Sequence, residues 1–295
     1  MRDDFDNLDV AGRGVAIAAR NARFGVYALL ILGVLLAWFL LGLMAIGAAG
    51  ALPPGTIGPG DWILRKFPDW PLPAPLAAFV GYCLSPAVTA WTAASSLAAL
   101  TAMWGLMSVA MMLPSAAPLV RTYCEIADTA AVKGERAVHP LVLVSGYLAV
   151  WAVASLCFAA LTIAFQWPAN VGGSPPTRHF AIAGAVLILA GLYQFSGLKE
   201  ACLKKCRNPF SILFARWTTS RRGIFRLGAE QGLWCLGCCW ALMLVMFAVG
   251  VMNVFWMALI AVFATVEKQA SSRLPSIASG AILLVWGAAL LVMSA

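Results

Sequence analysis

The chain has 295 residues, of which 62% are hydrophobic and only 11% are charged, and its formal net charge is +8. Soluble domains carry about a quarter charged residues, so a chain with a mean hydropathy of +0.87 has too little polar surface to face water on all sides. The composition excludes a soluble globular protein and predicts an all-α integral membrane protein.

Six apolar runs are long enough to cross a bilayer, because about 30 Å of hydrocarbon at 1.5 Å per residue needs a helix of about 20 residues. They are Phe24 to Ala51, Trp91 to Leu113, Leu141 to Trp167, Phe180 to Leu198, Leu233 to Ala264 and Ile277 to Val292. The first run is too long for a signal peptide and shows no obvious cleavage site, so we interpret it as a retained helix. The sequence predicts a basic tail at residues 1–23, followed by a single bundle of about six transmembrane helices over residues 24–295.

The positions of lysine and arginine predict the orientation of this bundle. The N-terminal tail and the segments 114–140 and 199–232 together hold fifteen of the twenty basic residues. Cytoplasmic loops carry the excess of positive charge, so both termini and the basic loop 199–232 are expected in the cytoplasm. The same bias accounts for the net charge, and no nucleic-acid partner is expected.

Two segments are longer than one upright span requires. Leu76 to Leu113 offers a break at Ser85-Pro86, and its first part is expected to be interfacial or re-entrant. Ala229 to Lys268 either tilts and protrudes or breaks around Gly250 to Asn253. A break that reversed the chain would give seven helices and an outside C-terminus, whereas we expect six.

Sulfur-bearing residues are concentrated on two of the predicted helices. Residues four apart are offset by only about 40° around a helix, so Met103, Met107 and Met111 form a ladder on one face. The fifth predicted helix repeats this pattern with Cys235, Cys238, Cys239, Met243 and Met246. A further pair with the same spacing, Cys202 and Cys206, lies in the basic loop.

Thiolate and thioether sulfur are soft donors that suit Cu(I), and thiolates also suit zinc. Zinc prefers four tetrahedral nitrogen or sulfur ligands. The chain has only two histidines, His139 and His179, which are expected on opposite sides of the membrane. The ligand set therefore favours copper, as Cu(I). In the expected topology Met111, the fifth-helix cysteines and the loop cysteines could meet near the cytoplasmic face.

Packing is the competing explanation for these residues. Methionine commonly fills irregular cores and cysteine behaves as a small hydrophobe, which suffices for Cys83, Cys124 and Cys157. The Cys-x-x-Cys-Cys motif is harder to explain in this way, because adjacent thiols pack no better than alanine or serine. Such clusters often bind metal, so the motif favours a functional role.

Polar residues within apolar segments are the other candidates, because they are costly in a membrane. Glu230 and Glu267 could be functional carboxylates, although Glu267 followed by Lys268 is more typical of a helix-end ion pair. Asn253 is expected to hydrogen-bond a neighbouring helix. Lys199 is interpreted as one of the charges that set the topology.

Three separated motifs carry a resemblance: MWGLMSVAMMLPSAAP, YQFSGLKEACLKKCRNP, and the segment that runs from GLWCLGCCW to Glu267-Lys268. They resemble a bacterial family of predicted metal-binding integral membrane proteins, named from a domain of unknown function, that includes a tyrosinase-associated membrane copper chaperone. The resemblance covers about residues 91 to 292. It implies metal binding, with copper as the metal, and a location in the inner membrane of a bacterium. The matched positions are Met103, Met107, Met111, Met112, Tyr193, Gln194, Lys199, Cys202, Cys206, Arg207, Cys235, Cys238, Cys239, Trp240, Met243, Asn253, Glu267 and Lys268. Relatives with histidine in place of Gln231 and tyrosine in place of Trp234 have a nitrogen ligand that this chain lacks, which implies an all-sulfur site here.

Three functions remain open. The first, which we expect, is a Cu(I)-binding membrane chaperone or permease that supplies copper to a copper-dependent enzyme or a metallochaperone, and is not itself an enzyme. An ATPase is excluded because no G-x-x-x-x-G-K-[ST] motif occurs and the loops cannot house a nucleotide-binding domain. The second is a membrane thiol–disulfide oxidoreductase that uses Cys235 and Cys238, which is disfavoured by their expected cytoplasmic side. The third is a structural subunit of a membrane complex.

Overall fold

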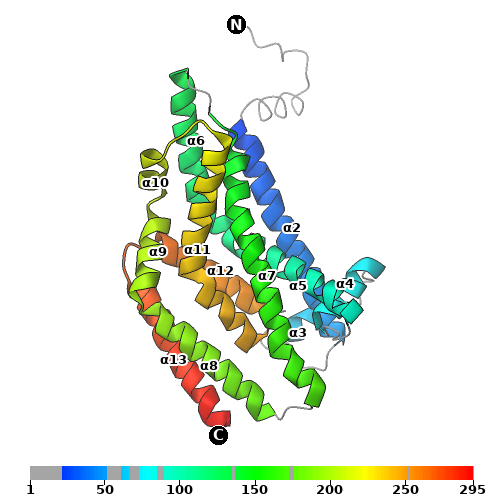
Figure 1. Cartoon of the computed structure of the whole chain (residues 1–295). Coiled ribbons are helices and arrows are strands. Elements are labelled where there is room, and N and C mark those ends of the chain that lie inside the picture. The colour runs from blue at the N-terminus through cyan, green and yellow to red at the C-terminus, as the bar shows by residue number, and fades with distance from the viewer. Residues whose placement is uncertain are drawn as a thin grey trace.

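The computed structural model describes residues 22–51, 61–66, 73–84, 90–134, 137–172, 176–250 and 253–294, and the regular structure of these residues is helical (Figure 1). The first half contains α2 (Ala22–Ala51), α3 (Asp61–Leu64), α4 (Ala74–Leu84), α5 (Ala90–Met112), the 3₁₀ helix η1 (Pro114–Ala116) and α6 (Ala117–Val132). The second half contains α7 (Pro140–Gly172), α8 (Pro176–Gln194), α9 (Gly197–Arg207), α10 (Pro209–Ala215), α11 (Arg221–Val249), α12 (Val254–Gln269) and α13 (Leu274–Ser294). The predicted basic tail falls almost wholly on residues 1–21, outside this description.

Five of these helices are long and apolar enough to cross a membrane. They contain Phe24–Gly50, Ala94–Met112, Pro140–Ala164, Arg221–Val249 and Leu274–Ser294. A sixth span results if α8 and α9, which are bent by 63° at their junction, count as one broken span. The expected all-α membrane bundle of about six helices is confirmed.

The two long segments are both divided in the structure. α4 ends at Leu84 and α5 begins at Ala90, on either side of the expected break at Ser85-Pro86, which itself lies outside the described residues. α11 ends before Gly250, whose φ of 98° is in the left-handed region that glycine adopts without steric strain. The side chain of Asn253 then accepts a hydrogen bond from the backbone N–H of Trp256 and caps α12. The expected hydrogen bond from this amide to a neighbouring helix stays a prediction.

The break reverses the chain, as in the alternative topology. α12 runs back along α11 toward α9, so the end of α13 and the start of α2 lie at opposite ends of the bundle, rather than at the same end as the preferred topology required (Figure 1). Lys268 and Arg273 thereby come to the α9 end, where Arg273 Nε lies 3.1 Å from Glu200 Oε2. The reversal therefore adds two more cations to the side that already carries the excess of positive charge, which is the distribution that the positive-inside rule favours.

The segments expected as basic inner loops are largely helical. α6, α10 and the first turns of α7 and α11 form a second small core, separate from that of the bundle, at the end where α2 begins (Figure 1). Its buried members are Leu119, Tyr123, Ala127, Leu143, Ile212, Leu213, Ile224 and Leu227.

Glycines bring α7 and α11 into close contact. A Cβ atom at Gly146 would meet the backbone of α11, and one at Gly228 would meet the Leu143 carbonyl of α7. A Cβ atom at Gly232 would lie 3.0 Å from the Tyr147 carbonyl oxygen. Small residues allow such backbone approach in membrane bundles, and here they bring Tyr147 alongside the cysteine-bearing stretch of α11.

Candidate metal centre

Four cysteine side chains, from Cys206, Cys235, Cys238 and Cys239, form what we call the thiol cluster. The Sγ atoms of Cys238 and Cys239 are 3.3 Å apart, and Cys206 of α9 places its Sγ 3.8 Å from that of Cys238. Cys235 lies one turn earlier on the same face of α11, and its carbonyl accepts a 3.1 Å hydrogen bond from the Cys238 thiol. The three cysteines of α11 are buried and Cys206 is half-buried, so the cluster faces the protein interior and not lipid.

Cys235 is the most densely contacted member of the thiol cluster. Its Sγ lies 3.0 Å from the hydroxyl of Tyr147 on α7 and 3.0 Å from Nζ of Lys268 on α12. Lys268 Nζ also donates a 2.6 Å hydrogen bond to Ser115 of η1, and the Tyr147 hydroxyl lies 3.1 Å from the Met112 carbonyl oxygen. Two helices, α7 and α12, therefore contact this sulfur atom directly, and η1 and α5 hold the two contacting groups in place.

The two cysteines of α9 have different surroundings. Cys206 faces Cys238, whereas Cys202 is buried against Gly237, where an added Cβ would come within 2.6 Å of the Cys202 Sγ. The i, i+4 pair predicted from the sequence thus packs on α11 as expected, but only Cys206 has a thiol partner in the described contacts. Cys202 lies beside the thiol cluster without belonging to it.

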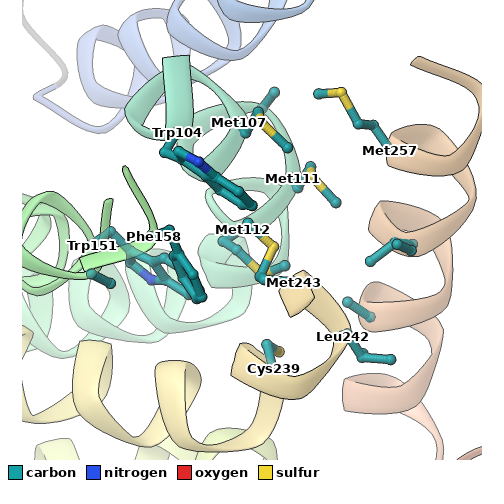
Figure 2. Close-up of a cluster of buried hydrophobic side chains, with 14 of the residues drawn as sticks. Trp104, Met107, Met111, Met112, Trp151, Phe158, Cys239, Leu242, Met243 and Met257 are labelled. Atoms are coloured by element: carbon teal, nitrogen blue, oxygen red, sulfur yellow. The ribbon is translucent and has the colours of Figure 1, made fainter. Parts of the chain in front are cut away.

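The predicted methionine ligands all point inward. Met103, Met107, Met111, Met243 and Met246 are each at most 1% exposed. Figure 2 shows Met107 and Met111 of α5 facing Met257 of α12, and Met112 beside Met243 of α11, with Cys239 one turn before Met243 on α11. Thioether groups therefore line the bundle interior up to the thiol cluster. Met252, which follows Met246 in the sequence, lies outside the described residues.

A pocket of about 370 Å³ lies between the ends of α9 and α12 and the start of α6; we call it the α9–α12 pocket. Its lining residues are Ser115, Pro118, Cys206, Arg207, Pro209, Thr265, Lys268, Gln269, Ala270 and Ser271. Because Cys206 and Lys268 belong both to this lining and to the contacts of the thiol cluster, the pocket gives a small group access to the cluster from the α9 end of the bundle.

A buried ion pair lies beside this region. Lys199 Nζ is 2.6 Å from Glu267 Oε1, and both side chains are at most 1% exposed. Gln194 accepts a hydrogen bond from Lys199, and Ser276 Oγ donates one of 2.6 Å to Glu267 Oε1. The expected helix-end pair of Glu267 with Lys268 is wrong, because these neighbours point to different partners. Lys199 is likewise a buried structural cation, in addition to any effect of its charge on topology.

The other candidate carboxylate, Glu230, and the described histidine, His139, have partners outside the thiol cluster. Glu230 pairs with Arg216, whose Nη1 is 2.5 Å from Glu230 Oε2 and whose side chain is exposed. His139 is exposed at the start of α7, where its Nδ1 accepts a hydrogen bond from the Leu141 backbone N–H. The side chain of His179 lies outside the description. The described contacts bring no histidine to the thiol cluster.

Across the described part of the chain, no three histidine, cysteine, aspartate or glutamate side chains are arranged as a preformed metal cage. The thiols of the cluster touch one another directly, so an ion bound between them would have to separate them. Thiol sulfurs in mutual contact nevertheless suit Cu(I), which accepts few, soft ligands, better than they suit zinc, which prefers four ligands in a tetrahedron.

Sequence reasoning missed Tyr147 and Lys268, which contact Cys235 of the thiol cluster, and Ser115, which contacts Lys268. Tyr147 is a lone hydroxyl within an apolar run, Ser115 follows a helix end, and Lys268 was assigned to another partner. The signal available for Tyr147 and Lys268 was their polarity inside or next to an apolar segment, since such groups need a buried partner. No sequence signal indicated Ser115.

A comparison with families of known proteins gives a match to this chain. The sequence model of a family described as "PpoB2: Copper chaperone" matches residues 101–290. The chain belongs to the PpoB2 copper chaperone family. The resemblance noted from the three motifs is thereby confirmed, and the matched region contains the thiol cluster and every methionine discussed above. No curated protein and no solved structure matches the chain.

Proposed function

We propose that this PpoB2-family protein binds Cu(I) at the thiol cluster and acts as a membrane copper chaperone or permease that supplies the ion to a copper-dependent enzyme or a metallochaperone. The observation that carries the proposal is the convergence of Cys206 with Cys235, Cys238 and Cys239 at the end of a methionine-lined core. A bacterial inner membrane is the proposed location, with the thiol cluster toward its cytoplasmic face.

The donor chemistry supports Cu(I) over the other common metal ions. Thiolates and thioethers are the soft ligands that this ion prefers, and carboxylate or imidazole groups that suit harder ions lie elsewhere in the described chain. Methionine sulfur is neutral and binds more weakly than thiolate, so methionines would hold an ion without trapping it. Cysteines at the end of the series would hold it more firmly.

The α9–α12 pocket supports release of the ion by ligand exchange. A thiolate of the recipient protein that enters the pocket would meet Cys206 first, because this residue is half-buried and lines the pocket. The incoming sulfur would form a bond to copper as one cysteine–copper bond breaks, and the released thiolate would take up a proton. This step needs no change in copper oxidation state.

Copper content tests the proposal. The full chain, purified in detergent from copper-fed cells, should contain about one copper ion per chain or more. A C235S/C238S/C239S variant should lose most of this copper, whereas a C83S/C124S/C157S variant, which removes the same number of thiols away from the cluster, should keep it. Equal copper in both variants, or none in the parent chain, would contradict the proposal.

A thiol–disulfide oxidoreductase is the second candidate, favoured by the 3.8 Å separation of the Cys206 and Cys238 sulfurs. Such an enzyme would cycle this pair between dithiol and disulfide as the membrane quinone pool is oxidised and reduced. Trapping of free thiols with a maleimide would then show a redox-dependent change at Cys206 and Cys238, with little bound copper.

A further inference from the structure

Lys268 places a positive charge directly on the proposed metal ligands. Its Nζ is 3.0 Å from the Cys235 sulfur, and Ser115 holds the same nitrogen at 2.6 Å. The described contacts give Lys268 no carboxylate partner, since the neighbouring Glu267 is engaged with Lys199. Its ammonium charge therefore acts mainly on the thiol cluster.

The net charge of a metal–thiolate complex depends on the valence of the ion. Two thiols that release their protons and bind Cu(I) form a complex with a net charge of minus one, and two that bind a divalent ion form a neutral complex. Isolated charge is strongly disfavoured in a low-dielectric interior, so each complex is most stable where its surroundings make the total neutral.

We infer that Lys268 makes the thiol cluster selective for a monovalent ion over a divalent one. With its ammonium group, a Cu(I) bis-thiolate becomes neutral, whereas a Zn(II) bis-thiolate acquires a net positive charge. The inference rests on the proposed function, because it assigns the cargo site to the thiol cluster, and it names the residue that sets the valence of the cargo.

The α9–α12 pocket reinforces this charge balance. Arg207 lines the pocket with Lys268, and its guanidinium is held by the carbonyl oxygens of Glu267 and Ser272 at 2.9 and 3.1 Å. No carboxylate occurs among the described lining residues. A free divalent cation that entered this pocket would therefore meet the positive charges of Arg207 and Lys268, whereas an anionic thiolate carrier of copper would be attracted.

Competitive metal binding tests the inference. The purified full chain would be titrated with Cu(I) and with Zn(II) against chromophoric chelators, and the ratio of the two affinities compared among variants. K268M should reduce the preference for Cu(I) over Zn(II) by about tenfold or more, because one close charge is lost from a partly buried site. K268R should keep the preference, and K204M, which removes an exposed lysine of α9, should not change it.

A second variant tests the charge without removing the lysine. S115D places a carboxylate beside Lys268 Nζ and should shift the preference toward Zn(II), as K268M does, even if K268M itself does not fold. If S115D or folded K268M keeps the same preference for Cu(I) over Zn(II), the inference about Lys268 is overturned while the proposed function stands. Absence of Cu(I) binding by the unmodified chain overturns the proposed function as well.

Discussion

Lys199 and Glu267 form a 2.6 Å ion pair that is almost wholly removed from solvent and joins α9 to α12. Two charges buried together are expensive to desolvate, but removal of one partner leaves the other uncompensated, which destabilises a fold by about 3–5 kcal/mol. The pair lies between the helix that carries Cys206 and the helix that carries Lys268, so it fixes the relative position of two parts of the candidate site.

Loss of one partner of this pair should therefore lower stability sharply. K199M and E267Q should each reduce the unfolding temperature in detergent, while K199M/E267L, which removes both charges, should recover much of the loss. Circular dichroism during heating measures this. Single variants as stable as the parent would show that the pair is not structural.

Cys202 is expected to serve packing rather than metal binding. G237A would place a methyl group about 2.6 Å from the Cys202 sulfur and should destabilise the protein. The double variant C202A/G237A, which removes the sulfur, should regain stability, with an interaction energy of about 1 kcal/mol between the two changes. Additive losses in this double-mutant cycle, or loss of copper in C202A alone, would contradict this assignment.

The buried methionines should matter for copper more than for folding. Leucine has nearly the volume of methionine, so M107L/M111L and M243L should each lower the free energy of unfolding by less than about 1.5 kcal/mol. Under the proposed function these variants should bind or transfer Cu(I) more weakly, as measured by the rate at which a Cu(I) chelator removes the ion. The variant L242M, at the position next to Met243 on α11, is a matched control. If the chelator removes Cu(I) from all the variants at the rate of the unmodified chain, the methionines serve only packing.

The break between α11 and α12 makes a prediction about topology. Reporters fused after Asn208 and after Ser271 should report the same side of the membrane, and one fused after Ser294 should report the opposite side. This result is expected because α12 returns to the α9 end of the bundle before α13 departs from it (Figure 1). A reporter at Ser294 on the same side as the one at Asn208 would restore six uninterrupted spans.

Composition and periodicity were sufficient to predict a helical membrane bundle, because apolar length and charge bias are direct consequences of the bilayer. The same reasoning located the sulfur-rich faces of α5 and α11, since i, i+4 spacing is a property of one helix. It preferred six spans without a reversal near Gly250, and the structure reverses the chain there. A single glycine and a single amide are compatible with either a tilted or an interrupted helix, so the sequence could not distinguish the two.

Contacts between helices were the part that sequence reasoning could not supply. The pairing of Glu267 with Lys199 instead of Lys268 depends on how α9, α12 and α13 pack, and not on neighbouring positions in the chain. The approach of Tyr147 to Cys235 depends likewise on the glycines of α7 and α11. A glycine allows two backbones to approach closely, but the sequence does not say which helix packs against it.

X-ray absorption at the copper edge gives the most direct test of an all-sulfur Cu(I) site. The copper-loaded full chain should show the edge of Cu(I), with sulfur alone in the first coordination shell, and C235S/C238S/C239S should lose this signal while C83S/C124S/C157S retains it. A first shell dominated by nitrogen or oxygen, or an identical spectrum in both triple variants, would contradict the assignment of copper to the thiol cluster.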